Sequence, residues 1–235
     1  MSVNQDSPVE PQNDKDRKVG NWGRWSLTAA SLLIILVAIV FALRPVTTPS
    51  VPTSKDSTTL ATPVNAGRRN PHIGPLDAPV TIVEFGDFAC PACGVWNQSG
   101  TLQKVLDKYG DKVRFVWADF PSITPDSSKA AEGARCAYDQ NKFWEYHDYL
   151  YSHMEAIGVN DLKVYASILG LDRKQFDQCL DQGARAEEIS NDFRDAVARR
   201  VGSLPTFYVN EVRLVGPLTL EQLSAVIDPI LTKTP

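Results

Sequence analysis

The spacing of apolar residues changes several times along the chain, and each change predicts a different element of secondary structure. Val80 to Phe85 and Val113 to Trp117 are short and mostly apolar, which is typical of buried β-strands. Between them the apolar residues recur at helical spacing until Gly110, which predicts one helix. Because a helix joins the two strands, we expect them to run parallel in a β-α-β unit.

The second half of the chain keeps the helical spacing and then returns to strands. Helices are predicted through the middle of the chain, one of them capped by Asn160 and another by Asp172. Thr206 to Val209 and Val212 to Val215 then indicate a β-hairpin with a two-residue turn between them. A capping box at Thr219 to Gln222 predicts the closing helix.

The N-terminal part of the chain predicts a membrane anchor. Leu27 to Leu43 carries no charge and is mostly apolar, and its length is at the lower limit of about 17 residues for a transmembrane helix. Basic residues are more frequent before this run than just after it, which places the N-terminus in the cytoplasm. We expect a disordered tail (1–26), a single-pass anchor (27–43), a Pro-, Ser- and Thr-rich linker (44–69) and an extracytoplasmic globular domain (70–235).

A cleaved signal peptide is the alternative to the anchor. Val40-Phe41-Ala42 fits the small-residue pattern of a cleavage site, and the product would then be secreted or periplasmic. In both cases most of the chain is exported, and disulfides persist outside the cytoplasm. The four cysteines are therefore expected to form two bridges.

The composition is that of a globular protein and gives no sign of nucleic-acid binding. A chain of 235 residues with 43% hydrophobic content can bury one good core. The net charge of −4, without a basic patch interleaved with aromatic residues, predicts no nucleic-acid partner.

Cys90-Pro91-Ala92-Cys93 follows the first predicted strand and carries the strongest chemical signal. Proline is favoured at the first position of a helix, so Cys90 is expected at a helix N-terminus. The free N–H groups and the dipole there stabilise a thiolate and lower the cysteine pKa. The alternatives are a structural disulfide, or half of a zinc site that Cys136 and Cys179 complete. The strand–loop–helix order favours redox chemistry.

Glu84 and the other two cysteines are the remaining candidates. Alternation along the first strand turns Glu84 inward, where a carboxyl group is costly unless it is paired or protonated. Buried acids with raised pKa values gather at functional sites, whereas the alternative is an acid at a sheet edge that reaches water. Cys136 and Cys179 lie on predicted helices of an exported chain, and we expect a structural disulfide between them rather than two buried free thiols.

Three segments resemble, in their order, the membrane-anchored members of the DsbA-like branch of the thioredoxin superfamily. They are Glu84–Cys93 (EFGDFACPAC), Phe143–His147 (FWEYH) and Leu204–Asn210 (LPTFYVN). The resemblance covers about residues 70–232. It implies an α/β, thioredoxin-like fold with a mixed central sheet and a helical block inserted at about residues 128–200.

The resemblance also implies roles for particular residues. Cys90 and Cys93 would form a catalytic disulfide, with Cys90 exposed and Cys93 buried, and Glu84 would relay protons for Cys93. A cis peptide bond between Leu204 and Pro205 would place the segment Leu204–Thr206 against the cysteines. There its backbone would pair with an extended substrate. The implied activity is that of a protein thiol–disulfide oxidoreductase without a cofactor or bound metal, oxidising reduced exported proteins and reoxidised by a quinone-linked membrane partner.

Two alternatives remain open. The family's prototype has His between its cysteines where this chain has Pro91-Ala92, so a disulfide reductase or isomerase is the alternative within the enzyme class. An isomerase would bring a dimerisation domain, which residues 1–69 look unable to form, and we expect a monomer. A tethered non-redox binding module, or a zinc-binding module that uses all four cysteines, is the alternative of a different class.

Overall fold

The computed structural model describes residues 70–233. The tail (1–26), the anchor (27–43) and the linker (44–69) that the sequence predicts lie outside the described residues. Between residues 70 and 233, none of the helices has both the length and the apolar character that crossing a bilayer requires.

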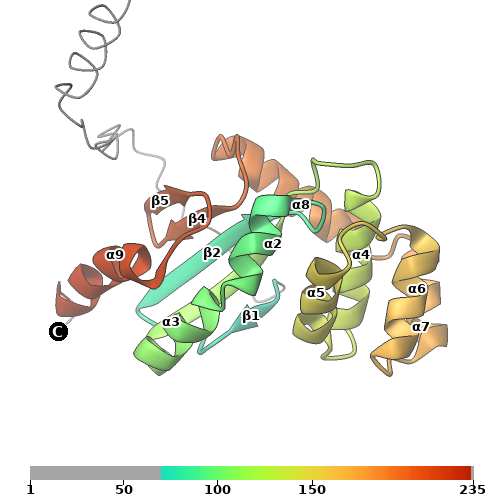
Figure 1. Ribbon diagram of the computed structural model, residues 1–235, viewed down its shortest axis with the longest axis horizontal. Helices are drawn as coiled ribbons and strands as arrows, with labels where there is room; N and C mark the ends of the chain where they lie inside the picture. Colours follow the sequence, from blue (N-terminus) through green and yellow to red (C-terminus); the bar gives the residue numbers. More distant parts are fainter. Residues whose placement is uncertain (1–69, 234–235) are drawn as a thin grey trace, which may run out of the picture. The chain divides into compact units, whose positions relative to one another are not determined.

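A five-stranded mixed sheet forms the centre of this domain, with the strand order β1-β3-β2-β4-β5 (Figure 1). Strands β2 and β3 pair in parallel, and the other neighbours pair antiparallel, which confirms the predicted β-α-β unit and hairpin. The two-residue strand β1 was not predicted, because two residues are too few to show a periodic pattern. The strands are β1 (His72–Ile73), β2 (Val80–Gly86), β3 (Val113–Asp119), β4 (Thr206–Val209) and β5 (Val212–Val215).

Helices cover both faces of the sheet. Helices α2 (Pro91–Gln98), α3 (Thr101–Tyr109) and α9 (Leu220–Lys233), with the 3₁₀ turn η1 (Gly110–Lys112) after α3, lie on the face toward which Val80 and Ile82 point. Helix α8 (Ala186–Ala198) lies on the opposite face, against Val83 and Phe85. This division follows from the alternation along β2, because successive strand residues point to opposite faces.

The helix predicted between the first two long strands is two helices. Gly100, with φ 66°, is the N-cap of α3 and interrupts the helical path. Ser99 stabilises the break, because its hydroxyl donates to the Trp96 carbonyl (2.6 Å) and accepts from the Thr101 N–H (3.1 Å). A left-handed backbone is least costly at glycine, so the break falls at this position.

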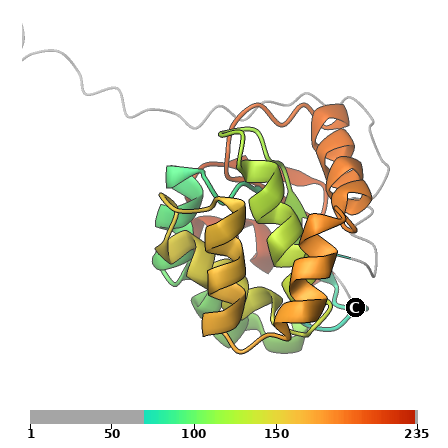
Figure 2. The same cartoon turned by 90° about the vertical axis from the view of Figure 1, so that its right-hand side faces the viewer.

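A block of helices between β3 and β4 confirms the predicted insertion, and Figure 2 presents it to the viewer. The predicted cap at Asp172 is confirmed, since its carboxylate accepts from the Gln175 N–H (3.0 Å). The predicted cap at Asn160 is wrong: Gly158 is the N-cap, and Asn160 lies inside the first turn. The block consists of α4 (Ser127–Tyr138), α5 (Phe143–Ser152), α6 (Val159–Ile168), α7 (Arg173–Asp181) and α8.

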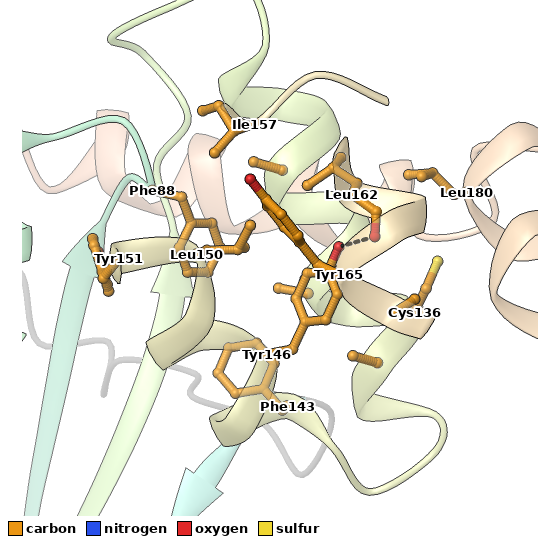
Figure 3. Packing of buried hydrophobic residues seen from close by; sticks show 14 of the residues in the cluster. Phe88, Cys136, Phe143, Tyr146, Leu150, Tyr151, Ile157, Leu162, Tyr165 and Leu180 are labelled. Atoms are coloured by element: carbon orange, nitrogen blue, oxygen red, sulfur yellow. Dashed lines mark hydrogen bonds between the residues drawn. The ribbon is translucent and has the colours of Figure 1, made fainter. Parts of the chain in front are cut away.

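The insertion has a core of its own that reaches the loop before α2 (Figure 3). Inside it the Tyr146 hydroxyl donates to the Leu162 carbonyl (2.8 Å), which satisfies a buried polar group. Phe88, from the loop after β2, lies among these side chains and stacks on Trp117 with ring centroids 5.1 Å apart. The same cluster contains Cys93, so the insertion and the cysteine loop share one core.

A buried ionic network joins the insertion to the end of β3. The Arg135 guanidinium donates to the Asp119 carboxylate (2.6 Å) and also bonds to Asp192 on α8. Asp192 in turn accepts from the Asn70 side chain and the Asp119 N–H. Because removing one partner of a buried pair leaves an uncompensated charge, this network fixes α4 and α8 against the sheet.

Candidate dithiol site

The two cysteines of the Cys-x-x-Cys segment lie at the N-terminus of α2. Cys90 is the N-cap, with an extended backbone (φ −86°, ψ 113°), and Pro91 occupies the first turn as expected. Both cysteines are free thiols in this structure. The Cys90 Sγ accepts a hydrogen bond from the Cys93 N–H (3.3 Å), so the free donors of the first turn point at this sulfur.

The two thiols differ in acidity. Hydrogen bonds from the Cys93 thiol and from the backbone N–H groups of Cys93 and Ala92 lower the pKa of Cys90 to about 7, although burial opposes them. Burial raises the pKa of Cys93, and the hydrogen bond to Cys90 acts in the same direction. Cys90 is therefore the more readily ionised thiol of the pair, and Cys93 is the one that holds its proton more strongly.

The expectation that Cys90 is exposed is wrong. Only 4% of its surface is accessible, compared with 0% for Cys93. Both sulfurs belong to the core that the insertion completes, and Ala89, Ala92 and Leu204 pack against that core. The acidity of Cys90 accordingly arises from hydrogen bonding rather than from contact with water.

Glu84 is buried in the middle of the sheet. It lies on β2 between Trp117 of β3 and Phe207 of β4, and 1% of it is exposed, which excludes the alternative of an acid at a sheet edge. Burial raises the pKa of Glu84 well above its usual value, and the charge of Cys90 adds to the rise. The charge of Glu84 also contributes to the raised pKa of Cys93, so the carboxyl group lies within electrostatic range of both cysteines.

The segment Leu204–Thr206 contains a cis peptide bond between Leu204 and Pro205. Thr206 is fully buried: its backbone pairs with β2 and β5, and its hydroxyl donates to the Ser203 carbonyl (2.6 Å). The Pro205 carbonyl accepts from Gly216 (2.8 Å). Leu204 is the one residue of the three that is partly exposed, so it is the part of the segment best placed to meet a substrate.

Asp87 is a residue of the site that sequence reasoning did not select. It is 2% exposed, and its carboxylate accepts from the backbone N–H groups of Ala89 (2.8 Å), Ser122 (2.7 Å) and Ile123 (2.9 Å). The bond to Ala89 is an Asx turn, and an Asp three residues before a helix cap is a sequence signal for one. The bonds to the segment after β3 have no local signal.

Cys136 of α4 and Cys179 of α7 are joined by a disulfide, with their Cα atoms 5.9 Å apart. The alternative of two buried free thiols is therefore wrong. A zinc site built from four cysteines would need these two sulfurs as thiolates, and the bond between them removes both. The structural role of the bridge stays a prediction.

Three comparisons extend these observations to known proteins. A family model described as thioredoxin matches residues 67–229. The Na⁺/H⁺ antiporter NhaA 3 of Salinispora tropica is 39% identical over 156 residues, which are 66% of this chain and 24% of the antiporter. The chain thus spans about a quarter of the length of that relative.

Solved structures resemble the domain over most of their own length. BdbD from Bacillus subtilis in its oxidised form has a TM-score of 0.64 and is 25% identical, covering 70% of this chain and 94% of that protein. The thiol–disulfide exchange protein α-DsbA2 from Wolbachia pipientis has a TM-score of 0.63 at 22% identity, covering 71% of this chain and 90% of that protein. The second likeness shows the fold alone.

Proposed function

The chain belongs to the thioredoxin family, and we propose that within it this protein uses the Cys90–Cys93 pair to oxidise the thiols of exported proteins. Its fold is that of the DsbA-like thiol–disulfide oxidoreductases. The observation that carries thiol–disulfide exchange is the difference between the two thiols: the pKa of Cys90 is lowered to about 7 at a helix N-terminus, while burial raises that of Cys93. The oxidising direction is supported by the Cys136–Cys179 disulfide, which fits an oxidising compartment.

Exchange proceeds in two displacement steps. A substrate thiolate attacks the Cys90 sulfur of the oxidised pair, the S–S bond breaks, and Cys93 takes the electron pair. Glu84, protonated because burial raises its pKa, gives its proton to the Cys93 sulfur. A second substrate thiolate then attacks the substrate sulfur of the mixed disulfide, and Cys90 leaves as a thiolate. The substrate is oxidised by two electrons and the enzyme pair is reduced.

Contact with the substrate is assigned to the segment Leu204–Thr206. Leu204 is partly exposed and packs against the core that contains Cys90, so its backbone is placed to pair with an extended chain. Pro205 is held by the bond from Gly216, the residue after β5, and Thr206 by its bond to Ser203. We propose no cofactor, because both steps use sulfur and proton chemistry alone.

The setting of the reaction is part of the proposal. A formed disulfide between Cys136 and Cys179 fits an oxidising compartment outside the cytoplasm, in which disulfides persist. The apolar run over residues 27–43 would hold a monomeric domain at the outer side of the membrane, near a quinone-linked partner that takes two electrons from the reduced pair. The match to the antiporter covers 24% of that protein, so its name supports no proposal of ion transport for this domain.

A reductase or isomerase is the second candidate, and the acidity of Cys90 favours it. Reactive cysteines of thioredoxin, a reductant, have a pKa of about 7, whereas that of DsbA, an oxidant, is about 3.5. The Cys90 pKa of about 7 is closer to the first. Direction therefore depends on the reduction potential and not on the fold.

Equilibration with glutathione tests the direction. The fraction of reduced protein is measured by thiol alkylation at a series of ratios of reduced to oxidised glutathione. A potential of about −120 to −180 mV supports the oxidase, whereas one near −270 mV assigns the reductase. Oxidation of a reduced, unfolded model protein by the Cys90–Cys93 disulfide provides the second measurement, and its absence would contradict the oxidase.

Replacing Glu84 with Gln is expected to stabilise the fold and slow the reaction. Because the pKa of Glu84 is raised in the folded domain, the folded domain holds a proton that the unfolded chain releases. The free energy of unfolding therefore falls as the pH rises above the Glu pKa of the unfolded chain, which is about 4.3. Gln carries no such proton, and the melting temperature at neutral pH should rise. Thiol exchange should slow by about 100-fold, because Cys93 loses its proton donor.

Glu187→Gln is the matched control for this experiment, since Glu187 is an exposed acid on α8. Stopped-flow tryptophan fluorescence and thermal melts from acid to neutral pH give the two readouts. Wild-type exchange rates in Glu84→Gln across that range would assign the carboxyl group a purely structural role.

A further inference from the structure

The Asp87 side chain joins two separate loops beside the dithiol. One is the turn from β2 into α2, whose Ala89 N–H donates to one carboxylate oxygen (2.8 Å). The other is the segment between β3 and α4, where Ser122 (2.7 Å) and Ile123 (2.9 Å) donate to the second oxygen. One buried carboxylate thus takes three backbone donors from positions that are far apart in the sequence.

The main chain of the same residue supports the reactive cysteine. The Asp87 carbonyl accepts from the Cys90 N–H (3.0 Å) and from the buried Tyr151 hydroxyl of α5 (3.3 Å). The N-cap of α2 is therefore fixed to Asp87, and Asp87 is in turn bonded to the insertion. Displacing Asp87 would move the Cys90 sulfur relative to the N–H groups of the first turn.

We propose that Asp87 is a positioning residue whose carboxylate clamps these two loops together and whose negative charge sets the reduction potential of the Cys90–Cys93 pair. The inference rests on the proposed thiol–disulfide exchange and deepens it, because it assigns the control of direction to one residue. Asp87 touches neither substrate nor the exchanging sulfur atoms in the steps above, and acts through Cys90.

The negative charge of Asp87 disfavours the reduced form of the Cys90–Cys93 pair. Reduction of the disulfide produces the Cys90 thiolate, so a neighbouring negative charge disfavours the reduced form and makes the pair a weaker oxidant. The charge of Asp87 raises the pKa of Cys90, in opposition to the hydrogen bonds that lower it. The three N–H donors partly neutralise the carboxylate and so limit its effect on the thiolate.

Asp87→Asn removes the charge and keeps one carbonyl oxygen as an acceptor. The pH midpoint of Cys90 alkylation should fall by about one unit, and the glutathione equilibrium should shift about tenfold toward the reduced protein. Asp126→Asn is the matched control, because Asp126 is exposed on the same loop and its side chain caps nothing. Its midpoint and equilibrium should stay at the wild-type values.

Ser122→Pro tests the role of the Asp87 charge through a shift in the opposite direction. It deletes one N–H donor and leaves the charge of Asp87 in place, so the carboxylate is less neutralised. The midpoint of Cys90 alkylation should rise by about half a unit, and the equilibrium should shift toward the oxidised protein. A role limited to holding the loops predicts lower melting temperatures for both variants without opposite shifts.

Opposite shifts of the Cys90 alkylation midpoint and of the glutathione equilibrium in Asp87→Asn and Ser122→Pro support the proposal. If only one of the two variants folds, the direction of its shift is the test. Wild-type midpoints and equilibria, or shifts in the same direction, overturn the proposal. If the wild-type protein does not exchange with glutathione at all, the proposed function fails instead, independently of Asp87.

Discussion

Cys90→Ser is expected to abolish thiol–disulfide exchange, and Cys93→Ser to trap the mixed disulfide. With oxidised glutathione, the Cys93→Ser variant should accumulate one glutathione per chain on Cys90, because no second thiol releases it. Cys90→Ser should remain unmodified, since Cys93 is fully buried and burial raises its pKa. Both results are measured by intact-mass spectrometry, which detects the glutathione bound to each native variant at neutral pH.

The pH dependence of Cys90 modification is a check on the same assignment. In Cys93→Ser, the rate should rise with pH as the thiolate forms. The midpoint should stay close to that of the wild-type protein, because the introduced hydroxyl can donate to the Cys90 sulfur in place of the Cys93 thiol, and the backbone N–H groups of Cys93 and Ala92 still lower the Cys90 pKa. Oxidation of a reduced model protein by Cys90→Ser at the wild-type rate would show that the assignment of the two cysteines is wrong.

Removing the Cys136–Cys179 bridge should destabilise the domain strongly and spare its activity. The bridged residues are 43 positions apart, and closing a loop of that length contributes about 4 kcal/mol to the free energy of unfolding in the chain-entropy model. The double variant Cys136→Ala/Cys179→Ala should therefore melt at a much lower temperature. Exchange by Cys90 and Cys93 should continue, because the bridge lies between α4 and α7 within the insertion.

Cys90→Ala/Cys93→Ala is the matched control, since it also removes two thiols but no bridge of the insertion, and it should lose much less stability. Gentle reduction of the wild-type protein should expose two thiols, and all four only after unfolding. Simultaneous reduction of both pairs, or free alkylation of Cys136 and Cys179 in the native protein, would contradict a structural bridge.

The local parts of the fold were predictable from sequence patterns. Val80–Phe85 and Val113–Trp117 are mostly apolar, and a helix between them requires parallel pairing, which β2 and β3 show. The inward direction of Glu84 follows from strand alternation alone. The break at Gly100 was missed because the apolar spacing of α3 continues that of α2 across one left-handed residue.

The less predictable features depend on contacts between distant segments. Asp87 binds Ser122 and Ile123, which lie beyond a whole β-α-β unit, and no spacing rule connects them. Leu204, which packs against the core that contains Cys90, reaches the site only after the inserted helices return the chain to the sheet. Acidity and exposure of the reactive thiol are therefore properties of the tertiary structure.

The small exposed surface of Cys90 restricts which substrate thiols can reach its sulfur. Rates of sulfur displacement depend on access, and with 4% of Cys90 exposed only a slender nucleophile reaches it. A chain that has just left the membrane offers its cysteines on extended, mobile segments, whereas a finished protein must first open locally. Under the proposed oxidase function, the same burial would act as a kinetic filter that favours transfer of disulfides to immature chains over completed proteins.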